Sequence, residues 1–405
     1  MVKIKHNFYI FNPVLLKFHY VFGLVFVIFA FLPWVNFGTN SRDTQAWPLI
    51  FGTLFLLISL KESLNFKELS IFTLPILALI AWFFFSQNIM DFIALRAIIN
   101  YLAFSVCFLA FTLFIKRYSF PWRLIISINI LYIFVGLIQL YIPDIVSNIV
   151  TTRGLIDSSR GVTSLTSEPT FFGLFLFFLS FLYLVESNFK PKTNLVLLIF
   201  INVLSIFFLS KSSTVALFFL ISIPFIFFTR FNFRLTFLIS CSTLLIIFLI
   251  PYLLDGSRLL DLYELVKEIG IMQLIFLDQS INDRVANVIY PLHGFYLNNF
   301  LPGGFHSFSQ MHIYLTDYYL GFFNFGSGST SILSYIGAFV YELGFLGIIF
   351  LLWIFVLIQD GTITRFFDTT LLFILLNSSV PPSLPLIPFI FAVYLLKNNN
   401  LENYD

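Results

Sequence analysis

The sequence predicts an all-α, polytopic membrane protein. Hydrophobic residues make up 59% of the chain and charged residues only 10%, whereas a soluble domain carries roughly 25% charged residues. Long apolar runs recur along all 405 residues. Continuous runs favour transmembrane helices, because a membrane β-barrel would show short segments of alternating polarity. We therefore expect a single membrane domain over residues 1–405, with about 12 transmembrane helices.

The first half of this domain contains five apolar runs, near residues 17–35, 47–60, 70–86, 98–115 and 123–142. Each approaches the roughly 20 residues that a helix needs to cross the hydrocarbon core, although the second is short. The first run follows several lysines and lacks a small-residue cleavage site, so we expect it to stay in the protein as a helix.

Four further runs follow, near residues 170–186, 194–210, 213–229 and 235–253. The first of them opens at Glu168-Pro169, and proline suits the first turn of a helix. Thr166 or Ser167 offers a hydroxyl cap for that helix. The second and third runs are separated only by a tight SKSST turn.

The last three helices are expected near residues 332–358, 366–378 and 383–396. The first of them follows a run of glycine and serine, and it is the longest of the apolar segments. The other two are short for membrane spans.

The positive-inside rule gives this series of helices an orientation. With the amino terminus inside, most of the 22 Lys and Arg residues fall in cytoplasmic segments, and both termini are cytoplasmic. Two long loops, 143–169 and 254–331, then lie outside. We expect the larger loop to be partly helical, with a short amphipathic helix at 259–269 before a glycine-rich, aromatic run at 290–328. The basic residues on the outer side are Arg42, Arg96, Arg153, Arg160, Lys211, Arg258, Lys267 and Arg284.

Composition excludes several classes of function. The net charge of +2 is spread over many loops, so nucleic acid is not an expected partner. Cys107 and Cys241 lie inside apolar runs and are expected to be small buried hydrophobic residues. His293, His306 and His312 are spaced by 13 and 6 residues, which matches no usual metal-ligand pattern, so neither a metal nor another cofactor is expected. We interpret the 58 phenylalanines and 18 tyrosines as reflecting lipid-facing surface and codon bias rather than a cofactor site.

The most unusual stretch is 153–173, a polar island between apolar helices. Arg153 and Arg160 lie on the expected outer side, against the usual preference for basic residues inside. A guanidinium group pairs bidentately with phosphate oxygens, so binding of an anionic group is one interpretation, and solvated loop arginines are the other. Glu168 either complements the dipole of the following helix or accepts a proton from a sugar hydroxyl.

Four other residues are candidates for the same site. Lys211 in the SKSST turn either snorkels to lipid headgroups or contacts phosphate. Arg284 adds a second outer cation, and His306 either packs or serves as a base. Glu342 lies within the helix at 332–358 and needs a partner there, so it is either structural or part of a substrate site.

These motifs together resemble the bacterial O-antigen polymerases, the Wzy-type polymerases of oligosaccharide repeat units, which are related to O-antigen ligases. The similar features are the loop running into SEPTFFG, the SKSST turn, the outer loop with NDR, and a glycine- and serine-rich entry to a helix reading YELGFLG. They occur in this order between residues 153 and 347.

The resemblance implies a metal-independent glycosyltransferase of the bacterial cytoplasmic (inner) membrane. Such an enzyme transfers a growing O-antigen or capsule-type glycan from undecaprenyl diphosphate to the next lipid-linked repeat unit. The resemblance makes Glu168, Arg160 and Arg284 candidate catalytic residues. Arg153, Lys211, His306 and Glu342 are then candidate substrate-binding residues.

Expected partners are undecaprenyl-diphosphate-linked oligosaccharides, membrane lipids, and a chain-length regulator and flippase of the same pathway. Two alternatives stay open. An O-antigen ligase would transfer finished glycan to a lipid core, but its relatives often carry a histidine where Ser329 to Ser334 lie here. A lipid-linked oligosaccharide flippase or transporter would line a polar path through the bilayer, whereas these helices carry few charges.

Overall fold

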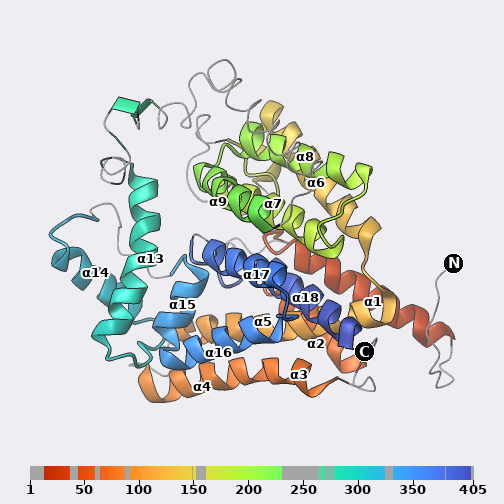
Figure 1. Ribbon diagram of the computed structural model, residues 1–405, viewed down its shortest axis with the longest axis horizontal. Coiled ribbons are helices and arrows are strands. Elements are labelled where there is room, and N and C mark those ends of the chain that lie inside the picture. The colour runs from red at the N-terminus through yellow and green to blue at the C-terminus, as the bar shows by residue number, and fades with distance from the viewer. Residues whose placement is uncertain are drawn as a thin grey trace.

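The protein is all-helical in the computed structural model, which describes residues 13–36, 44–59, 64–86, 92–147, 149–151, 161–229, 264–265, 267–268, 270, 273, 275, 278–323, 332–378 and 380–402. The only β feature among these residues is an isolated antiparallel bridge between Val35 and Val150. The main helices (Figure 1) are α1 (Pro13–Phe31), α2 (Trp47–Ile58), α3 (Phe66–Leu69), α4 (Thr73–Phe85), α5 (Phe92–Tyr118), α6 (Trp122–Tyr141), α7 (Pro169–Glu186), α8 (Thr193–Ser205), α9 (Ser213–Thr229), α13 (Gln279–Leu297), α14 (Phe308–Tyr318), α15 (Tyr335–Glu342), α16 (Phe345–Leu357), α17 (Ile363–Leu376) and α18 (Leu386–Glu402).

Many of these helices are apolar enough to lie in a membrane. Five helical segments have both the length and the hydropathy of a membrane span, and further apolar helices are shorter. The five are Phe66–Phe85, Ala94–Tyr118, Trp122–Tyr141, Pro169–Glu186 and Thr193–Ser210. The structure therefore supports a multi-pass membrane protein with the predicted helices close to their expected places. The helix expected at 235–253 lies outside the described residues.

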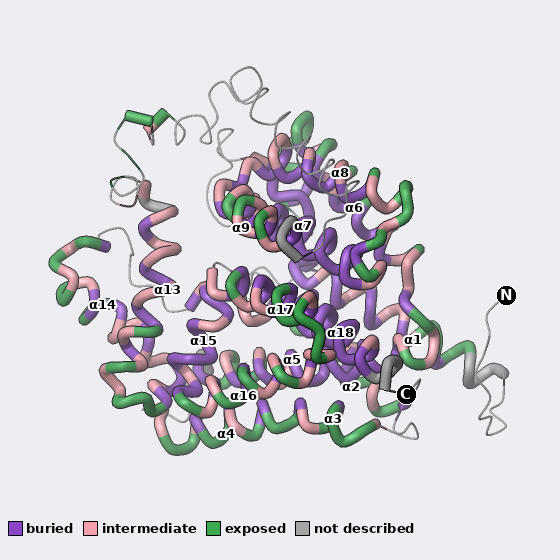
Figure 2. The backbone as a smooth tube through the Cα atoms, viewed as in Figure 1, coloured by how far each residue is buried: buried purple, intermediate pink, exposed green. Residues whose placement is uncertain are grey.

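The core is built around α5, α7 and α18. Helix α5 packs against α1, α2, α4 and α18, and α18 also packs against α7. Figure 2 shows α7 and α18 largely buried, whereas α3 and α4 are exposed along much of one side. Because α7 and α18 are surrounded by other helices, their apolar residues face protein rather than lipid.

Phenylalanine fills much of this core, which corrects the interpretation that these side chains reflect lipid-facing surface. The ring of Phe389 in α18 lies 4.1 Å from that of Phe111 and 5.3 Å from that of Phe31, measured between centroids. Such aromatic pairs contribute about 0.5–1.5 kcal/mol each beyond their buried area. Other phenylalanines, such as Phe83 and Phe134, are exposed, as expected of a lipid-facing surface.

The helix ends form two groups, and one of them is rich in basic residues. At this basic end, His19 Nε2 lies 2.7 Å from Ser59 Oγ, and Lys116 pairs with the buried Glu68 at 2.6 Å. Lys397 donates to the last carbonyls of α7 there. The basic residues that the described segments place at this end are Lys17, Lys67, Lys116, Arg117, Arg123, Lys190, Lys192, Arg365 and Lys397.

The opposite group of helix ends, which we call the site end, holds the predicted polar segments. The amide of Asn36 donates to the carbonyl of Ile149 at 2.7 Å, and Ser334 Oγ donates to the carbonyl of Asn377 at 2.9 Å. These bonds join turns that lie far apart in the sequence. The turns at this end connect α1 to α2, α6 to α7 and α17 to α18, so these helices run between the two ends of the molecule.

The long helix expected at 332–358 is instead two helices, α15 and α16. The break occurs at Gly344, whose φ of 59° and ψ of −141° are accessible almost only to glycine. A β-carbon there would lie 2.4 Å from the backbone nitrogen of Pro302. The chain is broken because the turn before α14 packs directly against this point, and the amide of Phe345 donates to the carbonyl of Phe300.

The expected outer loop at 254–331 is partly helical, since it contains α13 and α14. Figure 1 shows both at one side of the molecule, with α13 running crosswise to α4, α5 and α16. A small separate core supports them, in which Tyr290, Phe308, Leu315, Phe323 and Tyr341 are buried together. Much of the amphipathic helix expected at 259–269 lies outside the described residues.

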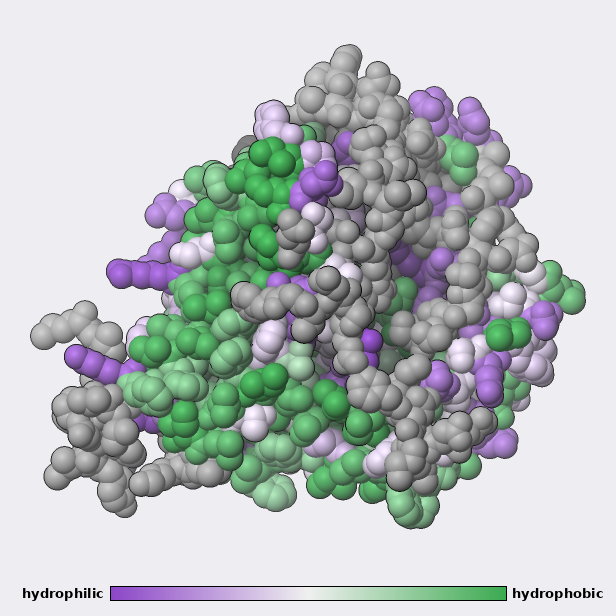
Figure 3. All heavy atoms as spheres, turned by 180° about the vertical axis from the view of Figure 1, so that it is seen from behind, coloured by the Kyte–Doolittle hydropathy of each residue, from purple (hydrophilic) through white to green (hydrophobic). Residues whose placement is uncertain are grey.

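The hydropathy of the molecular surface is that expected of a protein with many apolar helices. Seen from behind, hydrophobic residues form a continuous surface over the left-central and lower part of the molecule, and hydrophilic side chains lie at the left and right edges (Figure 3). Cys107 is buried in the core at 1% exposure, as predicted, whereas Cys241 lies outside the described residues.

Candidate functional site

A buried polar turn, residues 161–170, leads into α7 at the site end. Its hydroxyl groups are not offered to solvent. The amide of Ser164 donates to Gln139 Oε1 at 2.7 Å, and its hydroxyl donates to the carbonyl of Tyr132 at 2.6 Å. Thr166 Oγ1 lies 2.7 Å from the carbonyl of Glu168. The hydroxyl run noted in the sequence therefore fixes the shape of this turn.

The same turn packs closely on the SKSST turn. The amide of Val162 donates to the carbonyl of Leu209 at 2.8 Å. Gly161 has a φ of 82°, and a β-carbon there would lie 2.5 Å from the Leu209 carbonyl oxygen. Because only glycine fits this approach, the position of the turn is set by backbone contact. Arg153 and Arg160 precede it and lie outside the described residues.

Lys211 is placed beside the start of α7 by this packing. One π-helical turn, Ile206–Ser210, ends α8, and Lys211 then adopts a left-handed conformation with φ of 49°. Ser210 Oγ donates to the carbonyl of Pro169 at 2.9 Å. The tight turn was predicted, and this bond brings it into contact with the Glu168-Pro169 segment.

Arg284 reaches the same place from α13. Its Nη2 donates to Thr170 Oγ1 at 3.1 Å, and Thr170 lies in the first turn of α7. Asp278 caps α13 by accepting from the amide of Ile281 at 2.8 Å, which fixes the helix one turn before Arg284. Arg284 and the turn that carries Lys211, more than seventy residues apart in the sequence, thus both contact the start of α7.

Glu168 is the N-cap residue of α7, with an extended backbone and no side-chain capping bond. Neither Thr166 nor Ser167 caps the helix, contrary to expectation. The amino-terminal end of α7 carries a partial positive charge, which stabilises a nearby carboxylate by about 0.3–1 kcal/mol and also attracts other anions. We call the junction of Glu168, Thr170, Lys211 and Arg284 the α7 site, and it combines basic residues and a carboxylate at one helix start.

Asp283 is a second carboxylate near this site that the sequence reasoning gave no role. It is half-buried, and its Oδ1 is buried with no hydrogen-bond partner among the described residues. Burial raises the pKa of Asp283, whereas the neighbouring charge of Arg284 opposes that rise. The adjacent Asp-Arg pair in the sequence was the available signal.

The remaining predicted residues belong to a separate group. Tyr101 donates its hydroxyl hydrogen to Glu342 Oε2 at 2.6 Å, so the helix carboxylate has a structural partner. His306, with φ of 65°, lies just before α14. Its neighbour Phe305 contacts Tyr101, with a centroid distance of 5.9 Å. The amide of Phe305 also donates to Ser86 Oγ at 3.0 Å.

The described contacts thus divide the predicted site in two. Glu168, Lys211 and Arg284 gather at the α7 site. His306 and Glu342 lie near the end of α4. They are separated from Arg284 along the length of α13 and α15, which pack side by side. The two helices run in the same direction, with Asn287 bonded to the amide of Leu333 and Gly294 packed on Tyr341.

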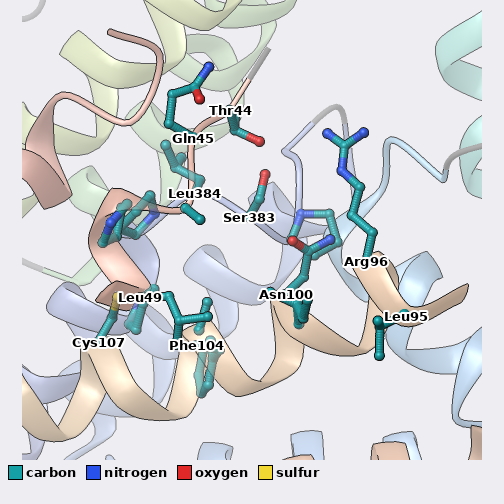
Figure 4. A pocket seen from close by; sticks show the side chains of 17 residues that line it. Thr44, Gln45, Leu49, Leu95, Arg96, Asn100, Phe104, Cys107, Ser383 and Leu384 are labelled. Atoms are coloured by element: carbon teal, nitrogen blue, oxygen red, sulfur yellow. The ribbon is translucent and has the colours of Figure 1, made fainter. Parts of the chain in front are cut away.

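Sequence reasoning also missed a cavity at the site end. It has a volume of about 420 Å³ and lies between α2, α5 and the start of α18. Figure 4 shows Arg96 and Asn100 on α5, with Gln45 and Ser383 across from them. Arg96 and Asn100 are four residues apart and so lie on one face of the helix, a spacing that was visible in the sequence.

The cavity is polar at one side and apolar at its base. Phe104 and Cys107 line the base, and Cys107 lies eleven residues along α5 from Arg96, or about 16 Å at the helical rise. One wall, near Gln45, connects to the α7 site through the 33–36 loop. The amide of Gln45 donates to the carbonyl of Pro33 at 2.7 Å, and Trp34 stacks on Phe171 of α7.

Comparison with known proteins adds no family to these observations. No known family model, curated protein or solved structure matches the chain.

Proposed function

We propose that the protein is a glycosyltransferase that polymerises lipid-linked oligosaccharide repeat units outside the bacterial cytoplasmic membrane. The observation that carries this proposal is the bond from Arg284 to Thr170 in the first turn of α7, beside the contact between Ser210 and Pro169 that brings the turn with Lys211 to the same helix start. Phosphate binding at a helix start with adjacent cations is well founded physically. The sequence resemblance supplies the substrate class, a glycan on undecaprenyl diphosphate.

In the proposed reaction, a hydroxyl of the next lipid-linked unit attacks the anomeric carbon of the growing glycan. A new glycosidic C–O bond forms, the C–O bond to the diphosphate breaks, and the bonding pair leaves with the diphosphate. Lys211, Arg284 and the α7 amino terminus stabilise the negative charge that develops on the leaving group. Fixed charges of this kind are often the largest single contribution to catalysis.

The acceptor hydroxyl loses a proton in this step, and a carboxylate is needed to take it. Glu168 is the proposed acceptor because it lies at the N-cap of α7, between the two cationic elements. Asp283 is the second candidate, since its buried Oδ1 has no hydrogen-bond partner among the described residues and burial raises its pKa. Each carboxylate can be replaced separately, by Glu168→Gln or Asp283→Asn, while Lys211 and Arg284 are left unchanged.

The proposed orientation follows from the distribution of charge. The basic end faces the cytoplasm under the positive-inside rule, so the α7 site faces outward. The lipid carrier would then lie in the outer leaflet with its diphosphate at the helix ends. Both termini are cytoplasmic in this proposal.

Deletion of the protein in its native host, followed by glycan analysis, tests the proposal. We expect the deletion strain to carry glycan of a single repeat unit on the lipid core. Expression of the intact protein should restore long glycan chains. Loss of all glycan from the core would indicate a ligase instead. Repeat units retained on the cytoplasmic side would indicate a flippase.

A further inference from the structure

A groove at the basic end lies on the opposite side of the protein from the α7 site. It has a volume of about 770 Å³ and runs between the amino-terminal parts of α6 and α8. Polar groups line its mouth and apolar side chains line the rest. The lining residues are Trp122, Ile126, Ile130, Ser187, Lys190, Lys192, Asn194, Leu195, Leu197, Leu198 and Ile201.

The mouth of this groove carries positive charge that the described residues do not neutralise. Lys190 and Lys192 are exposed, and within the described part of the chain neither ammonium group has a hydrogen-bond or ion-pair partner. The nearest acidic residue in sequence, Glu186, faces Lys397 instead, with an N–O distance of 3.6 Å. An anion at the mouth would meet two cations that are still available.

Two helix starts add to this charge. Lys192 is the N-cap residue of α8 and provides no side-chain acceptor for the first amides. Helix α6 begins at Trp122 beside it, also without a side-chain cap. Free amides and the helix dipole favour an anion at such a place, whereas a lysine there is electrostatically unfavourable. A bound anion would accept hydrogen bonds from the free amides and offset the positive charge of the lysine.

The rest of the groove suits a hydrocarbon chain. Trp122, Ile126 and Ile130 lie on one face of α6 and span eight residues, or about 12 Å. On α8, the side chain of Leu197 is 58% exposed, so the groove opens toward the lipid region. Tryptophan at the mouth matches its usual place at a membrane interface.

We infer that this groove binds an anionic phospholipid from the leaflet at the basic end. The lipid phosphate lies between Lys190, Lys192 and the start of α8, and one acyl chain follows the apolar wall of α6. Juxtamembrane lysines attract anionic lipids with about a fivefold gain in affinity each. Bound lipid would hold the Lys190–Lys192 turn against α6. This inference does not depend on the proposed glycosyl transfer.

Lipid titration of the purified, full-length protein tests the inference. Phosphatidylglycerol should bind more tightly than phosphatidylcholine, as followed by native mass spectrometry. Lys190→Ala/Lys192→Ala should weaken phosphatidylglycerol roughly 25-fold, a loss of about fivefold for each lysine. The matched control is Lys17→Ala/Lys67→Ala, which removes two exposed lysines from the same end outside the groove. It should leave the affinity nearly unchanged.

Two further experiments locate the bound lipid and distinguish lipid binding from binding of a free anion. Brominated phosphatidylglycerol should quench Trp122 fluorescence, and this quenching should be lost in Trp122→Phe. Leu197→Trp fills the apolar groove and should weaken lipid without changing the binding of inorganic phosphate. Its control is Leu220→Trp, at an exposed position on α9.

The inference is overturned if phosphatidylcholine binds as tightly as phosphatidylglycerol, or if the two double-lysine variants lose equal affinity. It is also overturned if Leu197→Trp leaves lipid binding intact while inorganic phosphate displaces the lipid fully. That result would show a site for soluble anions. All variants change exposed side chains except Trp122→Phe, and gel filtration checks that each remains a folded species.

Discussion

At the scale of single residues, the basic residues of the α7 site were predictable, but their contacts were not. Arg284 and Lys211 were recognisable because basic residues on the expected outer side run against the insertion preference. The partner of Arg284, Thr170, could not be predicted, because it depends on how α13 packs against α7. For the same reason, the sequence grouped Glu342 with the site, whereas Tyr101 binds it elsewhere.

Replacement of Arg284 tests the role of charge at the α7 site. Arg284→Ala should lower the rate of glycan lengthening by about 10² to 10³, the usual loss when one fixed donor to a developing charge is removed. Arg284→Lys should restore activity only in part, because an ammonium group lacks the planar fork of donors. Pulse-labelling of lipid-linked glycan measures the rate.

The matched control is Arg123→Ala, which removes an exposed arginine at the basic end. It should lengthen glycan at the normal rate. Equal rates of glycan lengthening in Arg284→Ala and Arg123→Ala would show that Arg284 has no role in the reaction.

Asp283 gives a pH-dependent prediction for stability. Because burial raises its folded-state pKa, its contribution to stability is present at low pH and is lost as the pH rises through that pKa. Asp283→Asn should therefore be more stable relative to the native chain above about pH 4, the ordinary pKa range of an aspartate, than below it.

Thermal unfolding in detergent from about pH 4 to 7 measures this difference. Burial lowers the pKa of His312, which acts in the opposite direction but cancels when the two curves are subtracted. The exposed Asp317→Asn is the control. A difference curve without slope for Asp283→Asn would show that burial does not perturb this carboxyl group.

At the scale of elements, helix positions were predicted well and helix interruptions were not. Apolar length places a helix, since each span must cross the same hydrocarbon core. Proline after Glu168 also located the start of α7. The break between α15 and α16 was not predicted, because it arises from close packing of the chain near Pro302 against Gly344. Sequence periodicity contains no record of that long-range contact.

Substitution at the break tests its cause. Gly344→Ala combines a backbone conformation nearly restricted to glycine with a steric clash, so it should destabilise the protein by at least about 1–3 kcal/mol. Gly361→Ala is a matched control, since Gly361 has φ of 78° but a β-carbon there would meet no other atom within 4 Å.

Thermal melts of the two variants separate these effects. The Gly344 variant should unfold at a lower temperature than the Gly361 variant, and the difference reports the clash. Equal melting temperatures would mean that backbone strain alone explains the break.

At the scale of the whole molecule, many basic residues of the described segments lie at one group of helix ends, and the orientation in the membrane stays a prediction from charge. Apolar runs and basic turns suffice to predict that pattern, because both are local features of the sequence. The packed core was less predictable. Phenylalanines such as Phe111 and Phe389 face each other inside the bundle, and composition alone cannot separate these from phenylalanines that face lipid.

Cysteine labelling tests the orientation directly. In a chain with Cys107 and Cys241 replaced by serine, a membrane-impermeant reagent should label Asn299→Cys in intact cells and leave Lys192→Cys unlabelled. Both positions are exposed, so access depends on the side of the membrane. Permeabilised cells should label both. Labelling of Lys192→Cys alone in intact cells would invert the topology and move the α7 site to the cytoplasm.

Reconstitution shows whether this protein by itself lengthens lipid-linked glycan. The purified protein is placed in liposomes with an undecaprenyl-diphosphate-linked repeat unit as the only substrate, and the products are separated by size. We predict a ladder of products that differ by one repeat unit, with release of undecaprenyl diphosphate. Unchanged single units, under conditions where the protein is folded and the substrate reaches the outward-facing end, would contradict the account.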